Sequence, residues 1–66
     1  MDRSILLRDI QHEIAHLAAL HIIYGLSNTP GFQRQKDLVS DLILKNKINV
    51  RTELDPISRN LYRRYY

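Results

Sequence analysis

Residues 5–26, ILLRDIQHEIAHLAALHIIYGL, decide the fold of this chain. The stretch contains no proline, and its only glycine, Gly25, stands near its end. Apolar residues recur every three or four positions, which is the period of an amphipathic helix with one buried face. Ser4 or Asp2 can cap the start of the helix, and Gly25 and Asn28 are candidate stop signals. We therefore predict a helix over about residues 4–26.

The last turns of this helix carry apolar side chains around their whole circumference. A helix that is apolar on every side needs cover on every side, and a chain of 66 residues has little left to provide it. We therefore expect this end to contact a second copy of the chain or a partner protein. The alternative is that the chain folds back tightly over it. The residues that we assign to the interface are Leu17, Leu20, His21, Ile23, Tyr24 and Leu26.

Two further helices are predicted in the second half of the chain. Thr29-Pro30 and Asp55-Pro56 each join a capping residue to the proline that suits a first helical position. They predict helices over about 30–45 and about 56–65. The side chains that we expect to be buried are Phe32, Leu38, Val39, Leu42 and Ile43 in the first of these helices and Ile57, Leu61 and Tyr65 in the second.

The residues between these helices, 47–54, alternate apolar and polar side chains, with Ile48, Val50 and Leu54 in phase. This spacing is typical of a strand. A lone strand has no partner inside the chain, so we predict an extended connector that could pair across a dimer. The predicted fold is all-α, a single domain over residues 1–66. It has a long helix, an antiparallel second helix that completes a helical hairpin, the connector and a short C-terminal helix.

Composition limits the function classes. Hydrophobic residues make up 44% and charged residues 26% of the chain, as in globular proteins. The chain has no cysteine, which excludes thiolate zinc sites and cysteine nucleophiles. A chain this short buries only about 60% of its unfolded surface, which leaves little room for a walled active site. We expect a protein that is not an enzyme and has no cofactor.

The longest apolar-rich stretch, residues 14–26, is interrupted by two histidines and is too short to span a bilayer. The N-terminus lacks the layout of a signal peptide, because no small-residue cleavage site follows an uninterrupted apolar block. We therefore expect a cytoplasmic, intracellular protein without a membrane partner.

Residues 12–16, HEIAH, match the pattern H-E-x-x-H. Two histidines one helical turn apart can bind zinc, and the glutamate between them can act as a general base. Residues 12–17 resemble the zinc helix of small metallopeptidases, which implies a zinc-dependent hydrolase. His21 lies about 140° round the helix from His16, so a straight helix cannot aim all three histidines at one ion. We interpret His12 and His16 as solvated residues of a polar face, with a metal that bridges two copies as the alternative.

His21 interrupts the apolar stripe between Leu17 and Tyr24. A buried neutral histidine needs partners for its ring nitrogens. We interpret His21 as a core residue bonded to a backbone carbonyl, to Tyr24 or to Asp41. The alternative is a histidine at a dimer seam, where protonation would weaken association.

Charge is unevenly distributed. The first 28 residues hold two basic and three acidic residues, whereas the rest hold eight basic and four acidic residues. Arginine pairs with phosphate and tyrosine can stack on unpaired bases, so the C-terminal segment predicts contact with nucleic acid or an acidic partner. The alternative is that the arginines stay solvated or pair with Asp9 and Glu13. The residues concerned are Arg59, Tyr62, Arg63, Arg64 and Tyr66.

The function that we predict is that of a small non-enzymatic interaction protein, an adaptor, inhibitor or regulator. It would act by docking on another protein and by self-association as a homodimer. The second class is a small basic nucleic-acid-binding regulator that uses the C-terminal arginines and tyrosines. The third class is a zinc-binding protein of the H-E-x-x-H type.

Overall fold

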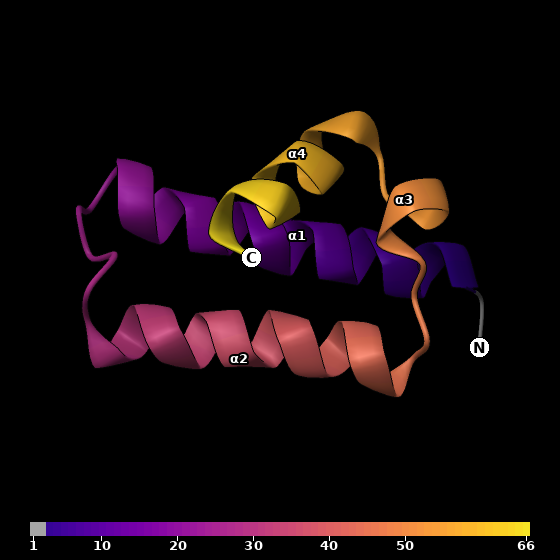
Figure 1. The fold of residues 1–66 in the computed structure, drawn as a ribbon, viewed down its shortest axis with the longest axis horizontal. Helices are drawn as coiled ribbons and strands as arrows, with labels where there is room; N and C mark the ends of the chain where they lie inside the picture. Colours follow the sequence, from indigo (N-terminus) through magenta and orange to yellow (C-terminus); the bar gives the residue numbers. More distant parts are fainter. Residues whose placement is uncertain (1–2) are drawn as a thin grey trace.

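Two long antiparallel helices form the frame of the molecule (Figure 1). The computed structural model describes residues 3–66, and every regular element within that range is a helix. The long helices are α1, Arg3–Ile22, and α2, Pro30–Lys45. A single turn, α3, covers Val50–Glu53, and the last helix, α4, covers Pro56–Tyr65. The predicted all-α fold with a helical hairpin is therefore confirmed.

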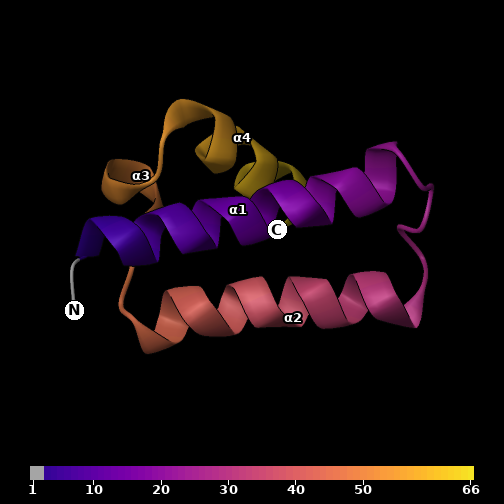
Figure 2. The same cartoon turned by 180° about the vertical axis from the view of Figure 1, so that it is seen from behind.

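The C-terminal helix α4 packs against α1 and reaches α2 with its last residues. Figures 1 and 2 show α3 beside the N-terminal end of α1, with α4 returning from there along α1. At the end of α4 the Tyr65 ring contacts Phe32, and the Tyr66 hydroxyl donates a hydrogen bond to the carbonyl oxygen of Lys36. The short helix thus closes the hairpin along one side.

The N-terminal end of α1 is held by the segment between α2 and α4. The Arg3 guanidinium forms a two-pronged ion pair with the Glu53 carboxylate, at 2.6 and 2.9 Å, and also donates to the carbonyl oxygen of Lys47 at 3.4 Å. Of the two predicted caps, Asp2 lies outside the described residues. Ser4 lies within α1, which begins at Arg3, and not at the position before the helix.

The other end of α1 comes earlier than predicted, at Ile22. Gly25 adopts the left-handed conformation, with φ 63°, which glycine reaches without the steric cost of a Cβ atom. Its amide donates to the carbonyl oxygen of His21 at 3.1 Å, and the Leu26 amide donates to that of Leu20 at 2.9 Å. The stop signal of Gly25 is confirmed. The predicted boundary was too late because the apolar pattern continues past the last helical turn.

The two predicted helix starts, Thr29-Pro30 and Asp55-Pro56, both begin helices in the structure. The Thr29 side chain accepts a hydrogen bond from the Phe32 amide at 3.3 Å. Asp55 takes the corresponding place before Pro56 at the start of α4, although its side chain does not make the equivalent capping bond. The buried Ser58, whose hydroxyl interacts with the Asp55 carboxylate, holds the pKa of that carboxyl below its usual value.

Helix α2 ends in the arrangement called a Schellman motif. The amide of Ile48 donates to the carbonyl oxygen of Ile43 at 3.0 Å, and the amide of Lys47 donates to that of Leu44 at 3.2 Å. Lys47 itself lies in the left-handed region, with φ 53°. The motif commonly brings the residue after it into contact with the helix, and Ile48 indeed joins Ile43 in the core.

The connector over residues 47–54 is not extended throughout, because one turn of helix, α3, lies in its middle. The Asn49 side chain accepts a hydrogen bond from the Arg51 amide at 3.0 Å, and the Asn49 amide donates to the Glu53 carboxylate at 2.7 Å. These two bonds cap the turn. The prediction of an extended segment is correct only for the residues on either side of α3.

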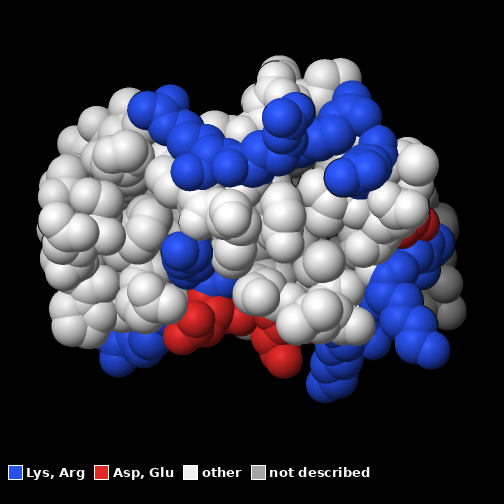
Figure 3. All heavy atoms as spheres, viewed as in Figure 1, with Lys and Arg blue, Asp and Glu red and all other residues white. Residues whose placement is uncertain are grey.

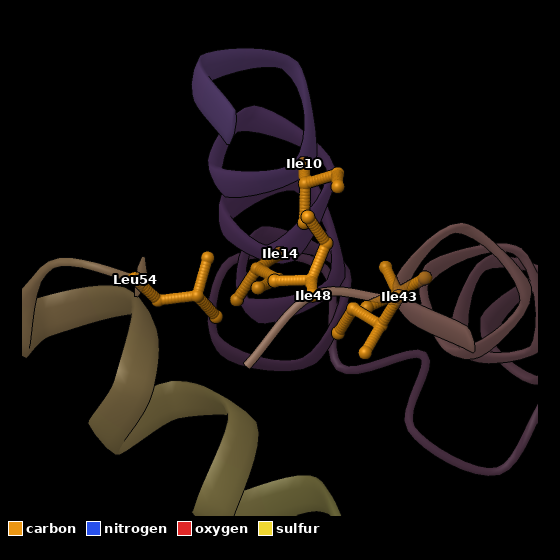
Figure 4. Packing of buried hydrophobic residues seen from close by; sticks show 6 residues of the cluster. Ile10, Ile14, Ile43, Ile48 and Leu54 are labelled. Atoms are coloured by element: carbon orange, nitrogen blue, oxygen red, sulfur yellow. The ribbon is translucent and has the colours of Figure 1, made fainter. Parts of the chain in front are cut away.

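The core lies where α1, α2 and the ends of α3 meet (Figure 4). Its buried members are Ile10, Ile14, Val39, Ile43, Ile48 and Leu54. Ile48 and Leu54 flank α3 and both reach this cluster, with Val50 packed at its edge. The alternation that suggested a strand therefore arises from two side chains that enter the core before and after a helical turn.

Two predictions of burial are wrong. Leu38 and Ile57 are both exposed. In α4 the inward positions belong to Ser58 and Leu61, which follow the buried Leu54 at helical spacing.

Candidate functional site

One end of the molecule presents large apolar side chains to solvent. The exposed fraction is 63% for Ile22, 71% for Ile23 and 67% for Tyr24, and Leu26 is exposed as well. We call these four residues the apolar end. They lie at the last turn of α1 and in the turn that follows it. No lysine, arginine, aspartate or glutamate occurs between Glu13 and Arg34 in the sequence, and the corresponding edge of Figure 3 shows none.

Three residues assigned to this interface instead pack within the chain. Leu17 is completely buried, so its assignment to the surface was wrong. Leu20 and His21 are half-buried. The structure adds Ile22, which the apolar circumference of the helix had indicated but which was not among the assigned residues.

His21 belongs to a cluster of three rings from three helices. Its Nδ1 atom lies 2.8 Å from the Tyr65 hydroxyl oxygen, whereas the predicted side-chain partners were Tyr24 and Asp41. The His21 and Tyr65 rings meet edge to face, with their centroids 5.5 Å apart. The centroid of the Phe32 ring lies 6.4 Å from that of His21 and 5.7 Å from that of Tyr65. Such edge-to-face pairs are favourable, and they fasten the last turns of α1 to α2 and α4 directly beneath the apolar end.

The second surface lies on α3 and α4. Arg51, Arg59 and Arg63 line one open hollow of about 800 Å³, together with Val50, Pro56, Asn60 and Tyr62. Arg64 follows and is exposed. We call Arg51, Arg59, Arg63 and Arg64 the arginine face. Figure 3 shows it as part of a band of basic side chains that runs along α4.

Arg51 was missed by the sequence analysis because its segment was taken as a linker. The signal that could have found it is Asn49 followed by Glu53, since this pair caps the turn that carries Arg51 toward α4. The Arg59 guanidinium then donates to the carbonyl oxygen of Arg51 at 2.7 Å. Helices α3 and α4 are thereby joined across the hollow.

The arginines of this face do not pair with acidic residues of the described chain. The ion pair found among residues 3–66 is that of Arg3 with Glu53. Glu13, one expected partner, is bonded to Gln35 instead, through the Gln35 amide nitrogen at 2.8 Å. The arginine face is therefore available to an external anion.

The tyrosines of α4 are engaged with one another. Tyr62 and Tyr66 stack with ring centroids 4.4 Å apart and an interplanar angle of 16°. The Lys36 ammonium lies 5.1 Å from the centre of the Tyr66 ring, and burial raises the pKa of Tyr66 to about 12. Tyr62 is also half-buried against the core, so both rings are engaged in contacts within the chain.

The H-E-x-x-H segment does not assemble a metal centre in the described structure. His12 and His16 are exposed along a shallow hollow of about 480 Å³ on α1. The Glu13 carboxylate and backbone carbonyl both accept hydrogen bonds from Gln35, at 2.8 and 3.0 Å. Across residues 3–66, no three histidine, aspartate or glutamate residues gather as metal ligands. Glu13 thus ties α2 to α1.

None of the helices in the described part of the chain has the length and the apolar character needed to cross a bilayer. The chain matches no protein-family model, and comparisons with curated proteins and with solved structures gave no match. The apolar end and the arginine face are the two surfaces on which a function can be based.

Proposed function

We propose that this chain is a non-enzymatic interaction protein, an adaptor, inhibitor or regulator, that self-associates and docks through its apolar end. The observation that carries the proposal is the run of three consecutive large apolar residues, Ile22 to Tyr24, each more than 60% exposed. Contiguous apolar surface of this kind is characteristic of protein interaction sites. Depletion of charge is the compositional mark of interface centres, and the apolar end meets that condition.

The distribution of charge favours a second copy of the chain as the occupant. In a two-fold symmetric dimer the same patch of each copy meets at the interface. The chain carries a net charge of +3, so a symmetric contact through a basic surface would oppose like charges. The apolar end has no such conflict, because its side chains are uncharged and can pack against their own symmetry mates.

The packing beneath the apolar end also supports docking. Association costs free energy when flexible groups must be ordered at the interface. The rings of His21, Phe32 and Tyr65 fix the last turns of α1 from below, and the Gly25 and Leu26 amides close the helix end. The surface is therefore already ordered in the single chain.

The test is the molar mass by light scattering over a concentration series, for the wild type and two variants. Ile23→Asp places a charge in the proposed seam. Ile57→Asp is the matched control, since both isoleucines are exposed to the same degree, 71% and 72%, and Ile57 lies on α4. We expect the wild type and Ile57→Asp to form dimers and Ile23→Asp to remain a monomer.

Two results would overturn the proposal. One is a wild-type chain that stays a monomer up to about 1 mM, which corresponds to less than about 4 kcal/mol of association free energy. The other is dimers that Ile23→Asp and Ile57→Asp weaken equally. Circular dichroism of both variants shows whether the fold is retained. Since both side chains are exposed, we expect stability to change by less than about 0.5 kcal/mol.

A further inference from the structure

The arginine face combines residues that are far apart in sequence. Arg59 and Arg63 stand one turn apart on α4, and the capped turn α3 places Arg51 beside them on the same hollow. Every basic residue after Lys47 is an arginine. Arginine presents a planar fork of donors that matches the oxygens of a phosphate in pairs, which the ammonium of lysine does not.

The shape of the hollow favours an extended ligand over a small one. It is open to solvent, and its lining comes from α3 and one side of α4. Arg64 follows Arg63 on α4, about 100° further round the helix, and is exposed; Figure 3 shows basic side chains in a band along α4. A row of cations along a helix suits a row of anions, such as the phosphates of a nucleic acid backbone.

The contacts of the tyrosine rings favour double-stranded over single-stranded nucleic acid as the ligand. Proteins that hold single strands stack bases on aromatic side chains. Here Tyr62 is stacked on Tyr66, and Lys36 lies over the Tyr66 ring. A duplex keeps its bases paired inside and offers only phosphate and sugar along its backbone, so it needs no free ring.

We propose that the arginine face binds the phosphate backbone of duplex nucleic acid without reading its sequence. Arg51, Arg63 and Arg64 contact phosphates, while Arg59, through its bond to the Arg51 carbonyl oxygen, also holds α3 against α4. This activity goes beyond docking through the apolar end and does not depend on it. The two surfaces lie on different parts of the molecule (Figures 1 and 3).

The test is fluorescence anisotropy with a labelled duplex of about 20 base pairs, or two helical turns, titrated at several salt concentrations from about 50 to 200 mM. The double variant Arg51→Ala with Arg63→Ala removes two members of the face. The matched control Arg34→Ala with Lys45→Ala removes the same charge from exposed positions on α2. The backbone bonds that cap α3 remain in the first variant.

We expect the wild type to bind the duplex with an affinity that falls steeply with salt. The arginine variant should bind at least tenfold more weakly at the lowest salt. The slope of log affinity against log salt should shrink by about two, or about one for each phosphate that the variant no longer neutralises. The control should bind less than about threefold more weakly, as expected for the general charge effect alone.

Three results would overturn the inference. The first is no duplex binding by the wild type at about 50 mM salt. The second is an equal loss of affinity in the arginine variant and the control. The third is tighter binding of another ligand, either the corresponding single strand or a poly-glutamate chain of the same charge. A preference for poly-glutamate would indicate an acidic protein partner. Ile23→Asp separates this inference from the proposed function, since it should change association and leave the intrinsic affinity of one chain for the duplex unchanged.

Discussion

The apolar end and the arginine face differ in the partner that each can accept. The apolar end, Ile22 to Leu26, lies in a stretch without charged residues and can pack against a copy of itself. The arginine face gathers like charges and repels its own copy. We therefore propose that, within one small chain, the placement of charge separates a surface suited to a second copy from one suited to a partner of opposite charge.

The two surfaces also differ in the helices and side chains that support them. The apolar end rests on α1 and on the rings of His21, Phe32 and Tyr65. The arginine face rests on α3 and α4, which join the core through Leu54 and Ile48. Tyr65 connects the two supports, because it belongs to α4 and bonds to His21 of α1. We therefore expect the surfaces to be lost together when the fold is weakened.

The largest effect is expected from Leu54→Ala, since Leu54 is buried between α3 and α4. Truncation of a buried leucine leaves a cavity and should lower the free energy of unfolding by about 2–4 kcal/mol. Urea denaturation followed by circular dichroism measures this loss. Leu44→Ala is the matched control, because Leu44 is 75% exposed and its truncation should cost less than about 0.5 kcal/mol.

The same denaturation series decides whether the two surfaces share one folding unit. For Leu54→Ala, duplex binding and self-association should disappear at the same urea concentration as the helical signal. Loss of duplex binding while dimers persist would show instead that α3 and α4 detach from an intact hairpin. That result would make the arginine face an independent, less stable part of the molecule.

A smaller effect is expected from Tyr65→Phe, which keeps the ring and removes the hydroxyl that bonds to His21. The loss of one partly buried hydrogen bond should cost about 1 kcal/mol. Tyr24→Phe is the control for the unfolding of the single chain only, at concentrations too low for association, since Tyr24 is largely exposed there. Thermal unfolding compares the two. If the ring cluster orders the apolar end, Tyr65→Phe should also weaken dimers; unchanged dimers would separate the two features.

The sequence predicts the hairpin because its signals are local. Thr29 with the following proline starts α2, and Gly25 stops α1, through bonds to residues only a few positions away. The sequence analysis also expected uncovered apolar residues at the end of the first helix, and the structure shows Ile23, Tyr24 and Leu26 exposed there. A helix of many turns also repeats its pattern often enough to be recognised.

The rest of the fold depends on contacts that local patterns do not contain. The turn α3 has four residues, too few to show a helical period, so the alternation around it looked like a strand. The inward positions of α4, Ser58 and Leu61, are in phase with Leu54, which lies outside that helix, whereas Ile57 is exposed. The bond from His21 to Tyr65 spans 44 positions and depends on where α4 crosses α1, which neither helix specifies alone.

The smallest effect is expected from the loss of the Arg3–Glu53 ion pair in acid, and it should act on the support of the arginine face. The ion pair with Arg3 holds the pKa of the Glu53 carboxyl below its usual value of 4.5, and the hydrogen bond from the Asn49 amide adds to this. A carboxyl with a lowered pKa in the fold stabilises the fold at a pH above its unfolded value, and the contribution is lost as the pH falls through the folded value. The stability of the chain should therefore decline below about pH 4.5.

The variant Arg3→Gln should show a shallower decline, because Glu53 then titrates more nearly as it does in the unfolded chain. Unfolding free energies from about pH 6 to pH 2 measure both curves, and identical slopes would mean that the pair does not hold α3 to α1. No carboxyl group lies between Glu13 and Arg34 in the sequence, so the stretch that forms the apolar end holds no carboxyl of its own. Below about pH 4.5, loss of the ion pair should therefore loosen the support of Arg51.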